Sequence, residues 1–393
     1  AMEAAGVLVD GPYLERLRTE FAARIEQVLR EVEKAAGRPV NVASTKQLGA
    51  FLYDDLKLPV PHETEKGGRS TDEEALTVLA ASHAVPRLVL DWREITKLQS
   101  TYVEALLAKR DPSDGRVRTR YDQAGTVTGR LSSSEPNLQN IPIRTPLGRR
   151  IRRAFVAAPG HVLVSADYSQ IDLRVLAHLS GDKALCTAFE AGGDVHARTA
   201  SEVFGVPLEK VDKEMRRRAK AVNFGVVYGQ TGFGLSHALG ISQAEAQEFI
   251  KGYFARYSGV KAWIDRTMKD AKSSGRVSTL LGRVRRLPEL SAKNPRMRMG
   301  AERMAVNTPI QGGSADIIKK AMVDLHVELV KGKRAGKMIL QVHDELVFEV
   351  PKGEAAALAA WAKGMMERAL PLKVPVVVDV KAGADWDDME PLR

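Results

Sequence analysis

Cysteine is almost absent from this sequence of 393 residues. The single one, Cys186, cannot form an intramolecular disulfide, and such sparse use is typical of a reducing compartment. The chain also lacks an apolar run of membrane-spanning length, a signal-peptide pattern and internal repeats. We therefore expect a soluble, cytoplasmic protein with no membrane partner, built from two or three domains as this length favours.

Positive charge exceeds negative charge, because the chain has 59 Lys and Arg residues and 49 Asp and Glu residues, which gives a formal net charge of +10. Arginines cluster at 116–120, 149–153 and 283–286. Basic side chains that neutralise phosphates supply most non-specific affinity for nucleic acids, so the composition favours a polyanionic partner. A basic cluster is equally typical of an ordinary solvated surface, and charge alone does not decide between them.

Two short acidic strings each follow an apolar run of strand length. Asp167 ends the run 162–166, which indicates a buried strand, and Asp344 lies between the runs 338–342 and 346–350, which predict paired strands. Two carboxylates on rigid sheet elements, 177 positions apart in sequence, suit a pair of Mg²⁺ ions, which prefer oxygen ligands. Asp also commonly closes turns, so either string alone would fit an ordinary turn.

Between these strings, residues 213–228 predict a helix with a stripe of cations and aromatic rings. The segment has no proline and is rich in helix formers up to Gly225. Steps of four residues drift only about 40° around a helix, so one face carries Arg216, Lys220, Phe224 and Tyr228. Cations suit a polyphosphate and rings suit a base. A solvated basic face would show the same spacing, but Gly225, which costs about 1 kcal/mol relative to alanine, favours close approach by another group.

These segments resemble the motifs of DNA polymerase family A, the DNA polymerase I family. Residues 167–174 resemble its first acidic motif, 216–228 its nucleotide-binding fingers helix, and 341–345 its last motif. Similar segments also lie at 128–133, 136–142 and 307–312. The motifs follow the family's order, and the similarity runs from about residue 1 to about residue 388.

The resemblance implies an α+β fold, namely a right-hand polymerase with an antiparallel-sheet palm, helical fingers and a helical thumb. The implied domains are palm for 1–12, 116–183 and 316–393, thumb for 13–115, and fingers for 184–315. Because the chain starts inside the family-like region, we expect a fragment without the nuclease domains that often precede it. Nothing in the sequence resembles a proofreading exonuclease.

The implied activity is template-directed DNA polymerisation. A primer 3′-hydroxyl would attack a deoxynucleoside triphosphate by two-metal phosphoryl transfer and release pyrophosphate. The implied cofactors are two Mg²⁺ ions, and the implied partners of a monomeric enzyme are primer–template DNA and deoxynucleoside triphosphates. The implied metal ligands are Asp167, Asp344 and the backbone carbonyl of Tyr168, and Lys220 would be a further catalytic residue that protonates pyrophosphate.

Other implied site residues contact the nucleotide or the DNA. The nucleotide-binding set is Gln170, Asp172, His196, Arg216, Lys220, Phe224 and Tyr228. The DNA-binding set is Arg130, Asn137, Gln139, Asn140, Arg144, Asn307, Gln311 and His343. Glu345 is by the family pattern the weaker candidate ligand. On spacing alone, His196 would be a surface or helix-start histidine.

Asp172 departs from the family pattern, which usually has Glu beneath the incoming sugar, hydrogen-bonded to the fingers tyrosine, here Tyr228. The shorter side chain opens space near the 2′-position. We therefore expect side activity on ribonucleotides or RNA templates, unless the backbone compensates. Phe224 in place of tyrosine implies poor acceptance of dideoxynucleotides.

Two other functions remain open at this point. A protein that only binds primer–template junctions would keep the basic surface and the stacking helix, but it would not need both Asp167 and Asp344. Single-subunit RNA polymerases and reverse transcriptases use related carboxylates for the same displacement. Phe224 and the string 341–345 favour a DNA polymerase.

Overall fold

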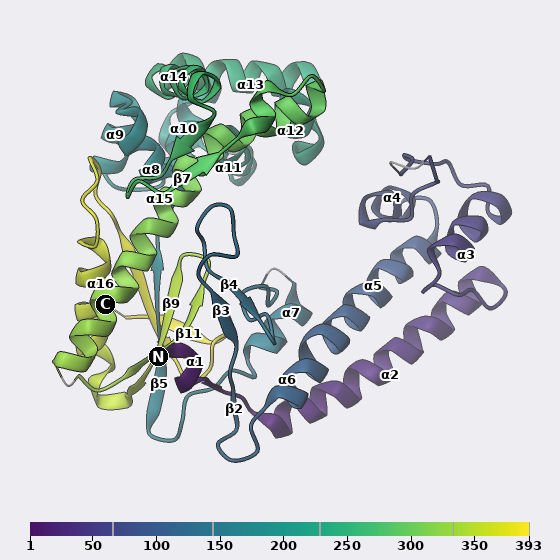
Figure 1. The fold of residues 1–393 in the computed structure, drawn as a ribbon. Helices are drawn as coiled ribbons and strands as arrows, with labels where there is room; N and C mark the ends of the chain where they lie inside the picture. The colour runs from purple at the N-terminus through teal and green to yellow at the C-terminus, as the bar shows by residue number, and fades with distance from the viewer. Residues whose placement is uncertain (65–66, 144, 228, 333, 393) are drawn as a thin grey trace.

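The computed structural model describes residues 1–64, 67–143, 145–227, 229–332 and 334–392. Figure 1 shows three parts: a central sheet, a long helical arm beside it, and a group of helices above one end of the sheet. Strands and helices are largely segregated along the chain, which confirms the expected α+β class.

The central sheet has five antiparallel strands in the order β11-β10-β5-β9-β8. Their bounds are β5 His161–Tyr168, β8 Lys337–Val342, β9 Glu345–Pro351, β10 Val378–Gly383 and β11 Met389–Pro391. The last residues of β5 pair with the start of β9, so that Asp167 lies opposite Glu345. The sheet thus brings two segments that are distant in sequence to one of its ends.

Both faces of the sheet are buried, which explains why β5 and β9 are apolar almost throughout. Leu163 packs in a core shared with the arm, whereas Val164 packs on the opposite face, in a core shared with α8 (Ile171–Ser180), α15 (Pro295–Lys331) and α16 (Ala355–Glu367). Val347 and Phe348 of β9 alternate in the same way. Because a slip of one residue would exchange the two faces, these cores fix the register that places Asp167.

The arm, residues 11–110, consists of two long helices and a tip. Its helices α2 (Gly11–Ala36) and α5 (Ala84–Leu98) run along each other (Figure 1). The side chain of Asp10 caps α2 by accepting a hydrogen bond from Tyr13 N, and Gly37 ends the helix in the left-handed region at φ 71°. Shorter elements are α3 Thr45–Ala50, α4 Glu73–Leu79, α6 Glu104–Lys109 and the π-helical turns η1 Phe51–Asp55 and η2 Gln99–Val103.

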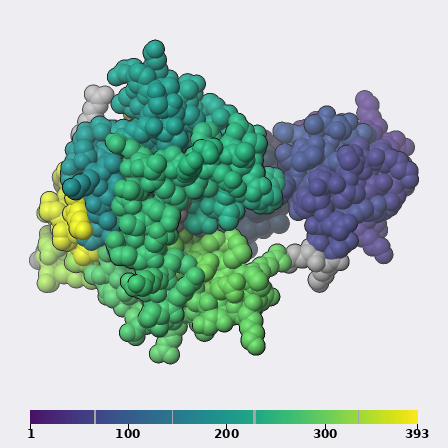
Figure 2. All heavy atoms as spheres, turned by 90° about the horizontal axis from the view of Figure 1, so that it is seen from above, coloured from purple at the N-terminus to yellow at the C-terminus, as the bar shows by residue number. Residues whose placement is uncertain are grey.

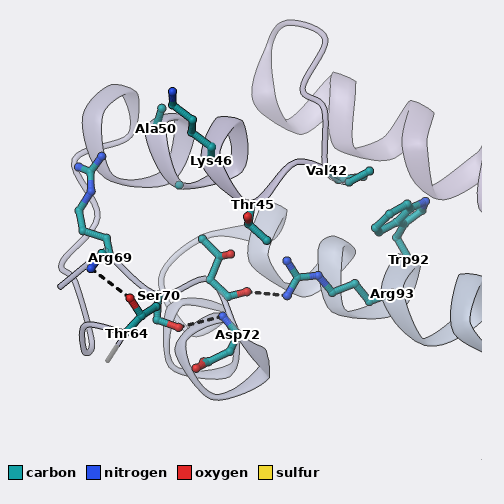
Figure 3. Close-up of a pocket in the computed structure, with 14 residues that line it drawn as sticks. Val42, Thr45, Lys46, Ala50, Thr64, Arg69, Ser70, Asp72, Trp92 and Arg93 are labelled. Atoms are coloured by element: carbon teal, nitrogen blue, oxygen red, sulfur yellow. Dashed lines mark hydrogen bonds between the residues drawn. The ribbon is translucent and has the colours of Figure 1, made fainter. Parts of the chain in front are cut away.

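The tip of the arm has an open cavity of 670 Å³ (Figure 3). Arg93 Nη1 donates to Thr71 O at 2.5 Å, and Asp72 N donates to Ser70 Oγ at 3.1 Å. The first bond ties the loop before α4 to α5, and the second lies within that loop. The tip lies at the far end of the arm from the sheet (Figure 1), so this cavity is separate from the sheet carboxylates.

The cap, residues 183–286, lies above the end of the sheet. Its elements are α9 Lys183–Glu190, α10 Val195–Phe204, η3 Leu208–Lys210, α11 Lys213–Val227, α12 Gly232–Leu239, α13 Gln243–Arg256, α14 Ser258–Ser274, β6 Arg276–Ser278 and β7 Val284–Arg286. The cap also meets the arm, since His237 Nε2 of α12 hydrogen-bonds to Glu74 Oε1 of α4. Figure 2 shows the arm beside the cap.

Short elements join these parts. They are α1 Met2–Ala5, β1 Val7–Leu8, β2 Arg116–Val117, β3 Arg120–Asp122, β4 Ser132–Ser134, α7 Pro146–Arg152, η4 Pro288–Ser291 and η5 Lys352–Glu354. No helix in the described part of the chain combines the length and apolar character that a membrane crossing requires.

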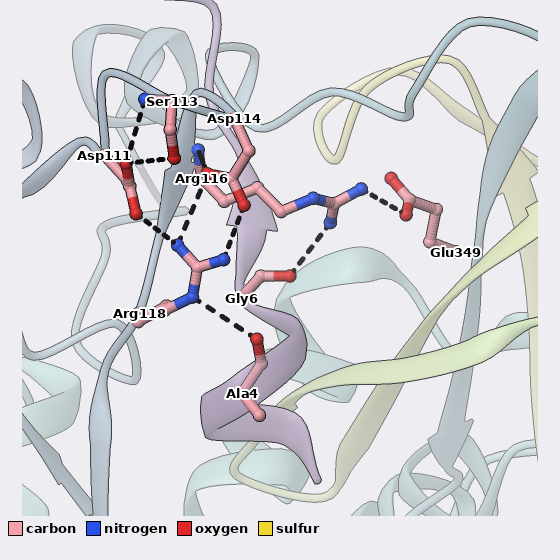
Figure 4. Close-up of polar contacts among 8 residues, drawn as sticks. All are labelled: Ala4, Gly6, Asp111, Ser113, Asp114, Arg116, Arg118 and Glu349. Carbon is pink, nitrogen blue, oxygen red and sulfur yellow. Dashed lines mark hydrogen bonds and ion pairs between the residues drawn. The ribbon is translucent and has the colours of Figure 1, made fainter.

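A buried ion pair fastens β2, which follows the arm in sequence, to the sheet (Figure 4). Arg116 Nη2 lies 2.5 Å from Glu349 Oε2, with side-chain exposures of 13% and 4%. Arg116 Nη1 also donates to Gly6 O at 3.1 Å, and Glu349 Oε1 accepts from Ala158 N at 3.0 Å. Neighbouring Arg118 pairs with Asp114, but at 37% exposure.

Removing one partner of this pair should destabilise the protein strongly. We expect Arg116→Met to lower the free energy of unfolding by about 3 kcal/mol, because it leaves the Glu349 carboxylate buried without its counter-charge. The matched control Arg118→Met removes an exposed pair and should cost less than about 1 kcal/mol. Urea unfolding followed by circular dichroism measures the free energy of unfolding of both variants. Equal decreases in that free energy would contradict a special contribution of the buried pair.

Candidate active site

The carboxylates of Asp167 and Asp344 come together at one end of the sheet. Asp167 is the next-to-last residue of β5, and it is exposed although the residues on either side of it in the strand are buried. Asp344 lies in the two-residue turn between β8 and β9, where His343 has the left-handed φ of 53°. Tyr168 N donates to Asp344 O at 3.1 Å, which ties the turn to β5. The hairpin and strand predicted from the apolar runs are therefore confirmed.

A cavity of 400 Å³ lies between this end of the sheet and the cap. The sheet side contributes both carboxylates and the cap contributes a wall of basic and aromatic side chains. Predicted site residues that line it are Asp167, Tyr168, Gln170, Asp172, His196, Arg216, Lys220, Phe224, His343 and Asp344. The structure thus gathers ten predicted residues from both parts of the chain around one space.

The surroundings of Asp167 and Asp344 disfavour the charged form of both carboxyl groups. Asp167 is exposed where it faces the cavity, but the surrounding protein partly desolvates its carboxyl group. This desolvation, followed by repulsion from Glu345, Asp344 and Asp379, raises the pKa of Asp167 to about 7. Desolvation and repulsion from Asp172 raise the pKa of Asp344 to about 6, against the opposing effect of Arg130. Two carboxylates whose ionisation is unfavourable in this cavity are a set of oxygen donors that fits divalent cations.

Few protein donors are available to such a cation. The described residues contain no group of three or more His, Cys, Asp or Glu side chains arranged to hold a metal ion. Glu345 is engaged elsewhere, since its Oε1 accepts from Ser165 Oγ at 2.6 Å and from Trp386 Nε1 at 3.1 Å. Two carboxylates, with water and substrate phosphate completing the shell, agree with the coordination that Mg²⁺ favours.

The raised pKa of Asp167 predicts a stability cost that depends on pH. A carboxyl group whose folded pKa lies above its unfolded value destabilises the fold fully above about pH 7 and not at all below about pH 4. We expect Asp167→Asn to raise the thermal midpoint of the metal-free protein at about pH 8, with the gain shrinking as pH falls. Differential scanning calorimetry measures this. The control is Asp265→Asn, which changes an exposed carboxyl group on α14 and should not raise the thermal midpoint. An unchanged midpoint for Asp167→Asn at alkaline pH would contradict the expectation.

Helix α11 presents its predicted stripe to the cavity. Lys220 Nζ lies 6.0 Å from the centroid of the Phe224 ring, and that ring lies 5.7 Å from the His196 ring. Arg216 Nε hydrogen-bonds to Asp194 Oδ2 at the start of α10. The stripe is confirmed as far as Phe224, whereas the predicted Tyr228, like the predicted Arg144, lies outside the described residues.

Asp172 is buried beside the cavity at 6% exposure. Its Oδ1 accepts from Ser314 Oγ at 2.5 Å, and Arg130 Nη2 lies 3.5 Å from its Oδ2 and 4.0 Å from Asp344 Oδ1. Arg130, predicted as a DNA contact, therefore also balances two site carboxylates. Ser314 was missed because a serine on α15, distant in sequence, carries no local signal of this contact.

Of the predicted DNA contacts that the structure describes, His343 lines the cavity and the others do not. Gln139 Nε2 donates to Gln341 Oε1 at 2.7 Å, and Gln341 Nε2 donates to His343 O, which links the segment 136–142 to the hairpin. Sequence analysis missed this buried role of Gln341. Asn137 Oδ1 accepts from Gln139 N at 3.0 Å, and the remaining predicted contacts are Asn140 in the same segment and Asn307 and Gln311 on α15.

Arg152 is a third residue that sequence analysis did not single out. It lines the cavity at 6% exposure, and its guanidinium carbon lies 4.1 Å from the centroid of the Trp386 ring. Its place in the arginine cluster 149–153 was visible in the sequence. Nothing local distinguished this buried member from its solvated neighbours.

Comparison with known proteins agrees with this geometry. DNA polymerase I of Thermus aquaticus, a thermostable enzyme, is 50% identical over 386 residues, which are 98% of this chain and 46% of the relative. DNA polymerase I of Geobacillus stearothermophilus is 48% identical over 388 residues, 98% of this chain and 44% of the relative. The chain therefore spans about half the length of these curated relatives.

A solved structure is also similar. The POL domain of Pol1 from M. smegmatis, in complex with DNA primer-template and dNTP, superposes with a TM-score of 0.94 at 44% identity, covering 98% of this chain and 68% of that one. The family model described as DNA polymerase family A matches residues 11–388. The chain thus belongs to DNA polymerase family A, as its motifs indicated.

Proposed function

We propose that this chain is a template-directed DNA polymerase that extends a primer 3′-hydroxyl with deoxynucleotides and releases pyrophosphate. The observation that carries the proposal is the cavity with Asp167 and Asp344 on one wall and the cation and aromatic face of α11 on the other. The names of the relatives agree with it. We assign residues 13–115, which include nearly all of the arm, to the thumb, and residues 184–315, which include nearly all of the cap and the first part of α15, to the fingers. Residues 1–12, 116–183 and 316–393 would form the palm.

The carboxylates of Asp167 and Asp344, with the carbonyl of Tyr168, would hold two Mg²⁺ ions in this proposal. The donor set fits them, because desolvation and repulsion between neighbouring carboxylates raise the pKa values of both groups, and a bound cation would relieve that repulsion. Bound there, the ions would supply a more acidic primer hydroxyl and neutralise charge on the triphosphate. Arg130, whose Nη2 lies 4.0 Å from Asp344 Oδ1, would keep the Asp344 carboxylate oriented toward the ions.

The cap residues would bind and orient the nucleotide. Arg216 and Lys220 would hold the phosphates, and Phe224 would stack on the base regardless of its identity. Lys220 Nζ would pass a proton to the departing pyrophosphate oxygen, and Gln170 and His196 would complete the nucleotide contacts. Such an arrangement works by positioning and by electrostatic stabilisation of the developing charge.

Extension of a labelled primer tests the proposal against its alternatives. DNA and RNA templates are each supplied with deoxynucleotides or ribonucleotides in the presence of Mg²⁺. We expect extension on DNA with deoxynucleotides to dominate. Binding without extension would favour a junction-binding protein, and dominant ribonucleotide use would favour an RNA polymerase. A monomeric state and a cytoplasmic location stay predictions.

Asp172 should weaken selection against ribonucleotides. Its Oδ1 is already held by Ser314 Oγ at 2.5 Å, so Asp172→Glu would place the longer side chain further into the space proposed for the sugar. Because one methylene in a pocket discriminates by about tenfold or more, we expect the preference for deoxynucleotides over ribonucleotides to rise about tenfold. Single-nucleotide incorporation kinetics measure the ratio. The control is Asp316→Glu, which changes a buried aspartate outside the cavity and should leave the ratio unchanged. An unchanged ratio for Asp172→Glu would contradict the expectation.

A further inference from the structure

A chain of buried polar groups runs through the cap behind the cavity. Asn223 Nδ2 lies 2.9 Å from His196 Nδ1 and 3.1 Å from Thr199 Oγ1. Thr199 Oγ1 lies 3.2 Å from the hydroxyl of Tyr257, which donates to Glu202 Oε2 at 3.0 Å. The chain thus links α10, α11 and the residue that follows α13 to the one cap histidine that lines the cavity, within the described residues.

The direction of these hydrogen bonds follows from the groups at the Glu202 end. A carboxylate only accepts, so the single proton of Tyr257 is directed to Glu202, which Arg256 Nη2 holds at 2.7 Å. The Tyr257 oxygen then accepts from Thr199, because only the Thr199 proton can lie between these two oxygens, although Val195 O at 2.9 Å and Asn223 Oδ1 at 3.3 Å are also within reach of that hydroxyl. With its proton directed to Tyr257, the Thr199 oxygen accepts from the amide nitrogen of Asn223 at 3.1 Å.

This direction fixes the orientation of the Asn223 amide. A flipped amide would take the Thr199 proton on Oδ1 and leave the Thr199 and Tyr257 oxygens 3.2 Å apart with no proton between them. With Nδ2 on this side, one amide hydrogen reaches Thr199 and the other reaches His196 Nδ1. His196 Nδ1 is therefore an acceptor, and the neutral imidazole carries its proton on Nε2.

We propose that Asn223, Thr199 and Tyr257 are positioning residues that hold His196 in its Nε2–H tautomer, so that it donates a hydrogen bond to the triphosphate. The inference rests on the proposed polymerase function, because it assumes that a triphosphate occupies the cavity. The other tautomer would present a lone pair to the phosphate oxygens and repel them. The network thus selects an anion-binding form of a residue that carries no net charge.

The surroundings of His196 keep it neutral. Desolvation lowers its pKa to about 4, against the opposing effect of Asp194 and with the support of Arg216 and Lys220 on α11. Tyr257, reached through Thr199, stays protonated because burial raises its pKa. A neutral donor of fixed tautomer gives the same contact at every pH in the working range, which a titrating imidazolium would not.

Nitrogen NMR of the ligand-free protein tests the tautomer without any substrate. With ¹⁵N-histidine labelling and assignment by His196→Gln, we expect an unprotonated Nδ1 and a protonated Nε2. Tyr257→Phe should break the direction of the chain and give a mixture of tautomers. Tyr253→Phe is the matched control, because among the described residues the Tyr253 hydroxyl is buried without a partner, on the same side of the cap. A protonated Nδ1 in the parent protein, or equal spectra for the two variants, would overturn the proposal.

Steady-state kinetics test the consequence for nucleotide binding. We expect Tyr257→Phe, but not Tyr253→Phe, to raise KM for the nucleotide about fivefold with little change in kcat, because a hydrogen bond to a charged group is weakened. Absence of polymerase activity in the parent would refute the proposed function, while the NMR result would still decide the tautomer.

The sharpest variant is Asn223→Asp. The introduced carboxylate would draw a proton to His196 Nδ1 and raise the pKa of the imidazole, so that Nε2 donates only while the ring is charged. We expect KM for the nucleotide, relative to the parent, to rise with pH through neutrality. The double variant Asn223→Asp, His196→Gln should show no such rise, because glutamine does not titrate. A flat profile for the single variant would overturn the proposal.

Discussion

Asp167→Ala and Asp344→Ala are each expected to slow primer extension at least about a thousandfold, while leaving the fold intact. Each change removes one of the two carboxylates that would hold the ions, and loss of about 4 kcal/mol of transition-state stabilisation gives a decrease of this size. Single-turnover extension of a labelled primer at saturating nucleotide measures the rate of the chemical step. Circular dichroism and calorimetry check that the variants are folded.

Glu345→Gln is the comparator for this result. Glu345 lies beside both aspartates and opposite Asp167 in the sheet, but its carboxylate is held by Ser165 and Trp386. We therefore expect a loss of about tenfold to a hundredfold, as for a side chain that supports the site rather than binding the ions. Equal losses for Glu345→Gln and Asp344→Ala would mean that charge in the cavity matters without the specific geometry of the two aspartates.

Lys220→Met should have the second largest effect, with a decrease in kcat of about a hundredfold to ten-thousandfold. That is the range expected when a proton donor to the leaving group is lost. Lys220 lines the cavity on the same face of α11 as Phe224, where a triphosphate would meet it. Rapid-quench kinetics separate this loss in kcat from weaker nucleotide binding, which the loss of positive charge would also cause.

Lys220→Arg distinguishes the two contributions of this lysine. Arginine keeps the positive charge but holds its protons too tightly to release one near neutral pH. We expect it to restore much of the nucleotide affinity lost in Lys220→Met and little of the kcat. Full recovery of kcat by Lys220→Arg would contradict the role as proton donor and leave Lys220 as a phosphate contact.

The ion pair of Arg216 with Asp194 gives the cap a defined resting arrangement. Arg216 Nε donates to Asp194 Oδ2, and the same carboxylate caps α10 by accepting from His196 N at 2.9 Å. A bound triphosphate carries more charge than one carboxylate and would draw the guanidinium into the cavity. Nucleotide binding would then loosen one contact in the cap as it makes another, as helices that close over substrates do.

Local sequence patterns predicted the elements that carry the site. The strand ending at Asp167 and the hairpin holding Asp344 were visible because apolar runs and a short polar gap are local features. The stripe on α11 was visible because its members recur at one helical period. Family resemblance then supplied roles that spacing does not give, such as that of His196.

Contacts between distant segments could not be predicted in this way. Ser314 against Asp172, Gln139 against Gln341, and Tyr257 behind Thr199 each depend on where separate elements meet. No periodicity or motif marks these residues as partners, and only the packed cores of the sheet and cap bring them together. The predicted roles of Arg130, Asn307 and the other DNA contacts also stay predictions.

The central claim is that two aspartates far apart in sequence jointly hold the ions of the reaction. Counting bound Mn²⁺ by electron paramagnetic resonance, in a complex with a dideoxy-terminated primer, template and the next nucleotide, tests it most directly. We predict two ions per complex for the parent protein and at most one for Asp167→Ala or Asp344→Ala. Two ions in both variants, with nucleotide bound, would contradict the account.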